Sequence, residues 1–257
     1  MSELIAKIQR SFSTQAINFE NKSMHFSKQA YLDYTVKSIE LCPADHVLEV
    51  AAGTCAIGRA IAPFVSRVTC LDATPSMLEV GKKKAEKEGL TNIYFIEGFA
   101  ENLPLSDSSF DVVVTRLSFH HFANMEDPFA QMHRVLKPGG KLVIIDMEAT
   151  RESLRKTADK IEAMRDFSHV RNRSKEEFEN LYRQHGYDII KEEITSIPVE
   201  LSAWMELTQV SDEIQREIRN LMKDDIGGGA ETGFMPYEKD GEIWFDQRWL
   251  LIIGTKC

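Results

Sequence analysis

The sequence of 257 residues lacks several features that would settle its class directly. It contains no run of about 18 apolar residues and no long apolar segment near its start, so we predict neither a membrane span nor a secretory signal. Its four cysteines lie far apart without a C-x-x-C spacing, which predicts reduced thiols and no metal site. With a net charge of −9, no nucleic-acid partner is expected. These absences favour a cytoplasmic globular protein.

Apolar runs and helix-like segments alternate through the first 150 residues, and no internal repeat or low-complexity segment interrupts them. The runs with strand character are 46–50, 67–71, 92–96, 110–115 and 141–146. Strands that alternate with helices at this spacing predict an α/β fold with a parallel, doubly wound sheet. After residue 146 the pattern changes: helical segments surround strand-like runs at 188–198 and 248–255.

The most informative segment runs from Val47 to Gly58 and reads VLEVAAGTCAIG. It is an apolar run containing the carboxylate Glu49, then a turn of small residues, then a helical pattern. A strand that delivers a nucleotide to a helix N-terminus has this order of parts. A second carboxylate, Asp72, ends the next apolar run about 20 residues after Gly53, which is the spacing expected for an acid that binds a ribose.

Five segments in the order 47–58, 68–78, 97–104, 109–113 and 134–140 together resemble the class I S-adenosylmethionine (SAM)-dependent methyltransferases, which have a Rossmann-like fold. Within this class they look like the branch that contains small-molecule and quinone-pathway enzymes. The resemblance implies a mainly parallel, seven-stranded sheet with a reversed last strand and helical elaborations at both termini. It predicts an N-terminal helical cap at 1–40, a SAM-binding core at 41–150, and a remainder at 151–257 with a substrate-side insertion near 200–240.

The same resemblance implies SAM as cofactor, S-adenosylhomocysteine (SAH) as product and a small-molecule methyl acceptor. Asp72 would accept both ribose hydroxyls, and Glu49 would face the amino group of the methionine portion. Backbone groups of the small-residue turn would line that portion. The cofactor-binding residues implied in this way are Glu49, Ala51, Gly53, Cys55, Asp72, Ala73, Phe99, Ala100, Arg116 and Leu117.

Two positions depart from the family pattern. Ala51 and Cys55 stand where the family usually has glycine. A non-glycine residue with positive φ costs roughly 1 kcal/mol or more, so we expect Cys55 to adopt an ordinary backbone conformation; the alternative is a thiol that lies beside the methionine portion. Phe99 stands where the family commonly has an aspartate that binds adenine, and its ring either stacks on adenine or enters the core.

The segment after the fourth predicted strand carries two adjacent histidines, His120 and His121. They lie at the carboxyl edge of the sheet, where ligands bind, and each is a candidate general base for an acceptor that holds a proton. In the family such a histidine is usually structural or part of the cofactor wall. Asp146 and Glu148, which follow the fifth strand, either face the acceptor or serve as capping and solvated groups.

Acceptor choice is expected to come from segments outside the resemblance. These include the N-terminal residues Phe12, Phe19, His25 and Phe26, and the loop 227–233, which is either a lid or a surface loop. Two rival functions remain open: a SAM-fold protein that binds a ligand or partner without turnover, and an NAD(P)-dependent oxidoreductase. A missing first glycine and the lack of a Tyr-x-x-x-Lys pair count against the oxidoreductase.

Overall fold

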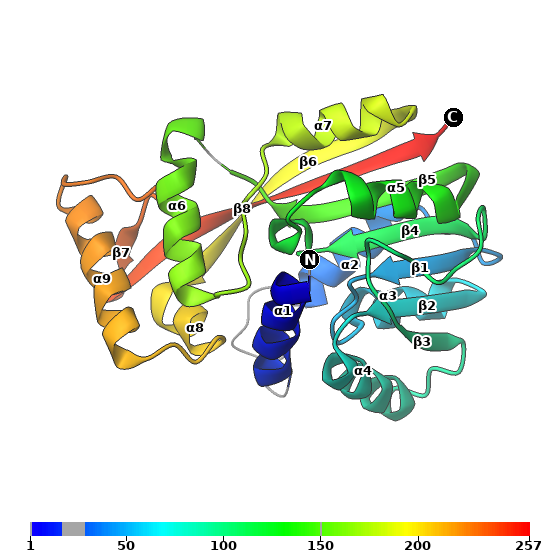
Figure 1. Ribbon diagram of the computed structural model, residues 1–257, viewed down its shortest axis with the longest axis horizontal. Helices are drawn as coiled ribbons and strands as arrows, with labels where there is room; N and C mark the ends of the chain where they lie inside the picture. The colour runs from blue at the N-terminus through cyan, green and yellow to red at the C-terminus, as the bar shows by residue number, and fades with distance from the viewer. Residues whose placement is uncertain (1, 17–28, 150) are drawn as a thin grey trace.

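A single sheet of eight strands organises the computed structural model, which describes residues 2–16, 29–149 and 151–257. The strand order is β3-β2-β1-β4-β5-β8-β6, and β7 pairs with β8 outside this path (Figure 1). The strands are β1 (His46–Val50), β2 (Arg67–Asp72), β3 (Ile93–Glu97), β4 (Phe110–Arg116), β5 (Leu136–Met147), β6 (Tyr187–Glu200), β7 (Tyr237–Lys239) and β8 (Glu242–Lys256).

The first five strands are parallel, and β8 runs antiparallel to both of its long neighbours, β5 and β6. The predicted mainly parallel sheet with a reversed last strand is therefore confirmed. The short β7 is an addition that the sequence analysis missed. It forms a hairpin with β8 through Asp240 and Gly241, whose φ values are +53° and +82°. An Asp-Gly dipeptide is a strong hairpin signal for this reason.

Helices follow the strands in the order expected for a doubly wound fold. They are α1 (Ser2–Gln15), α2 (Gln29–Ile39), α3 (Ala56–Ile61), α4 (Pro75–Lys87), α5 (Glu126–Val135), α6 (Glu152–Arg165), α7 (Lys175–Gln184), α8 (Leu201–Glu206) and α9 (Asp212–Ile226), with short 3-10 turns at Ala62–Phe64 and Phe119–His121. Ser174 and Glu177 form a capping box at the start of α7. The helices α8 and α9 are separate, because Ser211 caps a new start by accepting from the Ile214 N–H.

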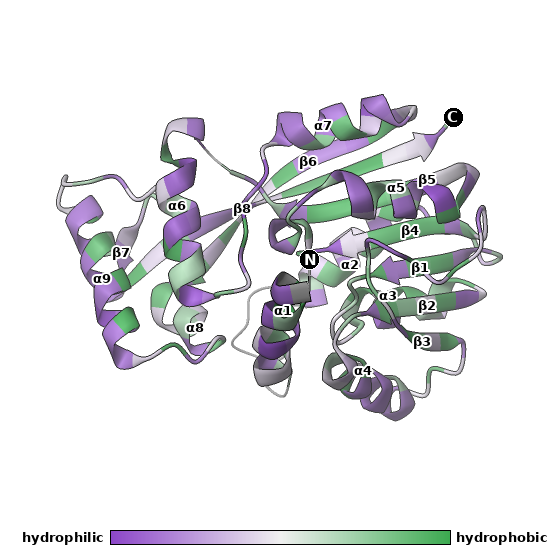
Figure 2. Cartoon of the chain, viewed as in Figure 1, coloured by the Kyte–Doolittle hydropathy of each residue, from purple (hydrophilic) through white to green (hydrophobic). Residues whose placement is uncertain are grey.

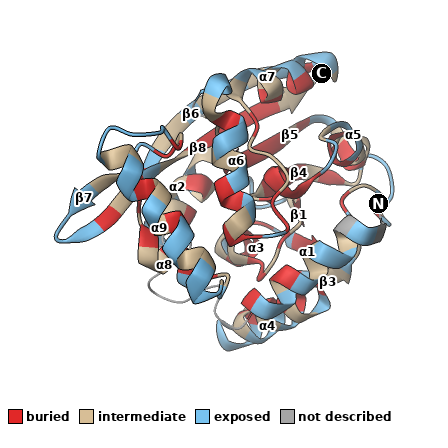
Figure 3. Cartoon of the chain, turned by 60° about the vertical axis from the view of Figure 1, so that its left-hand side comes forward, coloured by how far each residue is buried: buried red, intermediate tan, exposed pale blue. Residues whose placement is uncertain are grey.

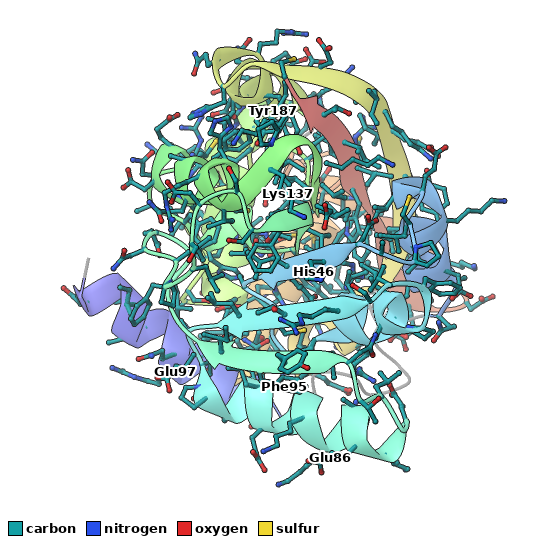
Figure 4. All side chains as sticks on the ribbon, turned by 90° about the vertical axis from the view of Figure 1, so that its right-hand side faces the viewer. His46, Glu86, Phe95, Glu97, Lys137 and Tyr187 are labelled. Atoms are coloured by element: carbon teal, nitrogen blue, oxygen red, sulfur yellow. The ribbon has the colours of Figure 1, made fainter. Side chains whose placement is uncertain are left out.

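The centre of the sheet is buried on both faces. Val112, Val113 and Val114 of β4 are at most 2% exposed, and Leu48 of β1 is fully buried. Figure 2 shows these inner strands as apolar, and Figure 3 shows them as buried beneath the surrounding helices. In Figure 4 the outer strand β3, with Phe95 and Glu97, forms one edge of the sheet, and α4, with Glu86, lies beside it. Such a core holds the ends of the strands in fixed positions, and ligand-binding sites of parallel sheets lie at these ends.

Two parts of the chain extend beyond this core. The helix α1 lies across the end of the sheet where the parallel strands finish (Figure 1). The long strands β6 and β8 project past the core, where α8 and β7 pack on them and α9 packs with α6. Trp204, Phe234 and Phe245 contact one another there at ring-centroid distances of 5.0 to 5.6 Å. Within the described residues, no helix is both long and apolar enough to cross a membrane.

Candidate active site

The turn between β1 and α3 contains three residues in the left-handed region of backbone space. The φ values are +52° at Ala51, +54° at Gly53 and +58° at Cys55. The expectation of an ordinary backbone at Cys55 is therefore wrong. The turn takes the conformation that glycine favours although two of its three positions carry a side chain. Cys55 has no exposed surface, and its Sγ lies 3.7 Å from the Gly53 carbonyl oxygen.

Glu49 lies beneath this turn at the end of β1 and is 3% exposed. Its Oε2 accepts from the Gly58 N–H at 2.8 Å and from the Cys70 thiol at 3.5 Å. Burial raises the pKa of Glu49 to about 7, although the Gly58 hydrogen bond and the charges of Arg116 and Arg59 act in the opposite direction. Near neutral pH this carboxyl group is therefore divided between its charged and neutral forms.

Asp72 ends β2 and joins the turn to the start of α4. Its Oδ2 accepts from the Gly53 N–H and its Oδ1 from the Thr74 N–H, both at 2.7 Å. Burial raises its pKa above the usual value, against the effect of these two hydrogen bonds. A carboxylate offers about four acceptor positions, so each oxygen retains capacity for another donor at the cleft.

These groups border a cleft of about 940 Å³, part of it open to solvent. All but one of the predicted cofactor residues line it: Glu49, Ala51, Gly53, Asp72, Ala73, Phe99, Ala100, Arg116 and Leu117. The exception is Cys55, whose side chain points into the core. Phe99 is 38% exposed, so its ring is accessible from the cleft and is not plain core.

Helix α1 forms one wall of the cleft. Ile5, Ile8 and Phe12 line it from positions three and four apart, which lie on one face of a helix. The Gln9 side chain donates to the Ala73 carbonyl oxygen at 2.7 Å, and Ser11 donates to Asp166 Oδ1 at 2.9 Å. Phe12 was among the residues predicted to influence acceptor choice, whereas the two isoleucines were not. Their amphipathic spacing was the available signal. Phe19, His25 and Phe26 lie outside the described residues.

The two histidines lie in different surroundings. His121 lines the cleft, and His120 does not. His120 Nδ1 lies 2.6 Å from Asp146 Oδ1. Burial alone would lower the pKa of His120, but the charge and hydrogen bond of Asp146 outweigh it and raise the pKa.

His121 Nδ1 lies 3.0 Å from the Ser168 carbonyl oxygen, which can only accept, so Nδ1 carries the proton and Nε2 is left as an acceptor. The Phe12 ring packs edge-on against this imidazole, with centroids 5.0 Å apart. Burial and the charge of His120 lower the pKa of His121 to about 3. His121 is therefore a neutral hydrogen-bond acceptor at physiological pH.

Asp146 and Glu148, the other two residues considered as groups that face the methyl acceptor, do not line the cleft. Asp146 is 1% exposed and accepts from the Ser118 and Phe119 N–H groups at 2.9 and 2.6 Å. Glu148 forms an ion pair with Arg248 at 2.8 Å. Within the described part of the chain, no residue after Phe122 lines the cleft. The loop 227–233 instead lies against α6 through Gly233, so it does not cover this cleft.

The sheet order and the acid-bordered turn define a class I methyltransferase, and comparison with known proteins agrees. The family model for the methyltransferase domain matches residues 48–144. The uncharacterized methyltransferase YcgJ of Bacillus subtilis is 28% identical over 250 residues, which cover 95% of this chain and 97% of that protein. Its solved structure has a TM-score of 0.79 at 26% identity and covers 89% of this chain and 99% of that chain. The chain belongs to the class I SAM-dependent methyltransferase family.

Two further relatives share shorter segments. The uncharacterized protein YafE of Escherichia coli is 33% identical over 156 residues, which cover 60% of this chain and 75% of that protein. The ubiquinone/menaquinone biosynthesis C-methyltransferase UbiE of Ectopseudomonas mendocina is 34% identical over 117 residues, or 44% of this chain and 46% of that protein. The chain thus matches about half the length of UbiE.

Proposed function

We propose that this protein transfers a methyl group from SAM to a small-molecule acceptor by in-line displacement. The observation that carries the proposal is the pair of buried carboxylates, Glu49 and Asp72, which border one cleft beside a turn held by both of them. SAM has an ammonium group and a ribose diol, and these are the donors that two carboxylates would accept. When bound, SAM supplies an activated methyl group on a sulfonium sulfur.

The roles of the other residues follow from their positions in the cleft. Phe99 would stack on the adenine through its accessible ring, and the Ala100 backbone would lie beside it. Arg116 ends β4 and Leu117 follows it, and both would border the methyl-donating portion of SAM. Ile5, Ile8 and Phe12 close the cleft from α1, exclude water and hold the acceptor in line with the methyl group. Alignment of this kind supplies a large part of the acceleration in a displacement reaction.

His121, and not His120, is the histidine that would meet the acceptor. Its low pKa makes it a weak base, so we assign it a positioning role: its Nε2 accepts a hydrogen bond from the acceptor. The apolar character of the α1 wall favours an apolar or aromatic acceptor. The similar protein UbiE is by name a C-methyltransferase of ubiquinone and menaquinone biosynthesis, which supports an acceptor of this kind.

Calorimetric binding of SAH to the wild type and to Asp72→Ala tests the cofactor assignment, with NADH as the control ligand. Two charge-assisted hydrogen bonds at about 1.5 to 3 kcal/mol each predict an affinity loss of about 100-fold or more. Asp107→Ala is a matched control, because this aspartate is exposed and pairs only with Arg134 at 2.6 Å among the described residues.

Absence of SAH binding to the wild type, or equal affinity in Asp72→Ala, would overturn the cofactor assignment. Methyl transfer from labelled SAM to a panel of apolar and aromatic acceptors then tests turnover. A protein that binds SAH but methylates none of them would support the rival function, in which the fold binds its ligand without turnover.

A further inference from the structure

Two thiols and a carboxyl group meet beneath the turn that borders the cleft. Cys55 and Cys70 have no exposed surface, and Glu49 is 3% exposed. One ligand atom from each of the three lies within 4.8 Å of the other two. Cys70 lies in β2, and Cys55 is the residue directly before α3. The spacing of the cysteines along the sequence therefore did not indicate this cluster.

Glycines on the two neighbouring helices leave room for the sulfur atoms. A Cβ atom at Gly58 of α3 would lie 2.5 Å from Cys70 Sγ and 2.7 Å from Glu49 Oε2. A Cβ at Gly81 of α4 would lie 3.0 Å from Cys55 Sγ. Any larger residue at these positions would displace the cluster. The surrounding fold is therefore shaped around the three donor atoms.

We propose that Cys55, Cys70 and Glu49 bind one soft divalent cation of the Zn²⁺ type, and that this ion and the cofactor exclude each other. Thiolate sulfur with one carboxylate oxygen is a ligand set that suits Zn²⁺. Metal–sulfur bonds of about 2.3 Å and metal–oxygen bonds of about 2.1 Å place such ligand atoms roughly 3.5 to 4 Å apart. The separation of 3.5 Å between Cys70 Sγ and Glu49 Oε2 already meets this requirement.

Binding would proceed with a defined balance of protons and charge. Burial raises the pKa of both thiols, so both hold their protons in the metal-free protein. Two S–H bonds break, two sulfur–metal bonds form, and the two protons pass to solvent, together with the Glu49 proton in those molecules whose carboxyl group still holds one. The ion with two thiolates and one carboxylate carries a net charge of −1. Arg59 and Arg116 supply positive charge close enough to act on Glu49.

The exclusion of the cofactor follows from the shared carboxylate, and this half of the inference rests on the proposed function. Glu49 is the acid proposed to receive the amino group of the methionine portion. When its oxygen binds the ion, that charge is no longer available to the ligand. The turn residues Ala51, Gly53 and Cys55 would also shift as the Cys55 sulfur moves onto the metal.

Cadmium titration tests the site, because cadmium thiolates absorb in the ultraviolet through sulfur-to-metal charge transfer. The background is the variant Cys42→Ala/Cys257→Ala, which removes the two exposed thiols. At pH 8, where Glu49 is already mostly ionised, we expect one Cd²⁺ per chain, the charge-transfer band, and release of about two protons per ion. Adding Cys55→Gly should abolish the band and weaken binding at least about tenfold. Its φ of +58° suits glycine, so this variant is expected to fold.

Cys70→Ala in the same background removes the other thiol and should have the same effect. Absence of cadmium binding in the background variant, or binding that survives both substitutions, would overturn the site. For the second half, saturating Zn²⁺ should raise the Kd of SAH about tenfold or more in the background variant and leave it unchanged in Cys55→Gly. An unchanged Kd with the metal bound would overturn the exclusion. Failure of the proposed function would appear separately, as absent SAH binding without metal, while the cadmium titration still reports on the site.

Discussion

The affinity for SAH should increase about tenfold between pH 6 and pH 8, because Glu49 must be ionised to receive the amino group. Burial raises the pKa of this carboxyl group to about 7 in the ligand-free protein. It is then ionised in about one tenth of molecules at pH 6 and about nine tenths at pH 8. Because only the ionised fraction is competent, apparent affinity follows it. The change corresponds to about 1.4 kcal/mol of binding free energy.

Calorimetry at pH 6, 7 and 8, in two buffers that differ in protonation enthalpy, measures both the affinity and the protons released. We expect release of about half a proton at pH 7, where about half of the carboxyl groups are still protonated. The glutamine of Glu49→Gln cannot titrate, so the SAH affinity of this variant should lose the pH dependence. The variant thereby distinguishes titration of Glu49 from titration of the nearby Asp72. A wild-type Kd that stays constant from pH 6 to 8, or an equal slope in Glu49→Gln, would refute the reasoning.

Three further predictions concern single residues. The usual pKa of 4.5 for Glu49 applies to the unfolded chain, so between about pH 4.5 and 7 the folded state holds more protons and its stability falls as pH rises. At pH 8, urea unfolding should therefore find the ligand-free Glu49→Gln variant more stable than the wild type by up to about 3 kcal/mol. A less stable variant would contradict this. Phe99→Ala should weaken SAH binding about tenfold or more by calorimetry through lost stacking, whereas the exposed Tyr94→Ala, outside the cleft, should not; equal affinities would count against stacking. Asp146→Ala should cost about 3 to 5 kcal/mol in urea unfolding because it leaves buried His120 unpaired, against about 1 kcal/mol or less for the exposed Asp107→Ala, and similar losses would contradict the pairing.

The sequence predicted the parallel half of the sheet because buried strands form apolar runs whose order along the chain sets the topology. It also predicted that Glu49 and Asp72 end neighbouring strands, since the carboxyl ends of parallel strands meet at one edge. The backbone conformation of Cys55 could not be predicted from the sequence. Intrinsic backbone preference argues against positive φ, but the thiol is packed against Cys70 and opposite Gly81, and these contacts are tertiary.

The sequence did not show which of the two adjacent histidines faces the cleft. His120 and His121 share one segment, and only the 3-10 turn at Phe119–His121 directs one toward Asp146 and the other toward the cleft. The docking of α1 was likewise not predictable from the sequence. The spacing of its apolar residues indicates an apolar face but not the surface that this face covers. The division into α8 and α9, and the hairpin of β7, depend on local caps and turns whose signals are short.

The acids of the site also hold the shape of the turn that they border. Asp72 accepts from the Gly53 N–H and Glu49 accepts from the Gly58 N–H, one on each side of the left-handed residues. The turn is therefore ordered as the chain folds and does not wait for a ligand, so little conformational entropy remains to be lost on binding. A substitution at either acid changes the architecture of the empty protein as well as its affinity. Each acid therefore acts in the empty protein as well as in the complex, because it fixes one side of the turn before a ligand arrives.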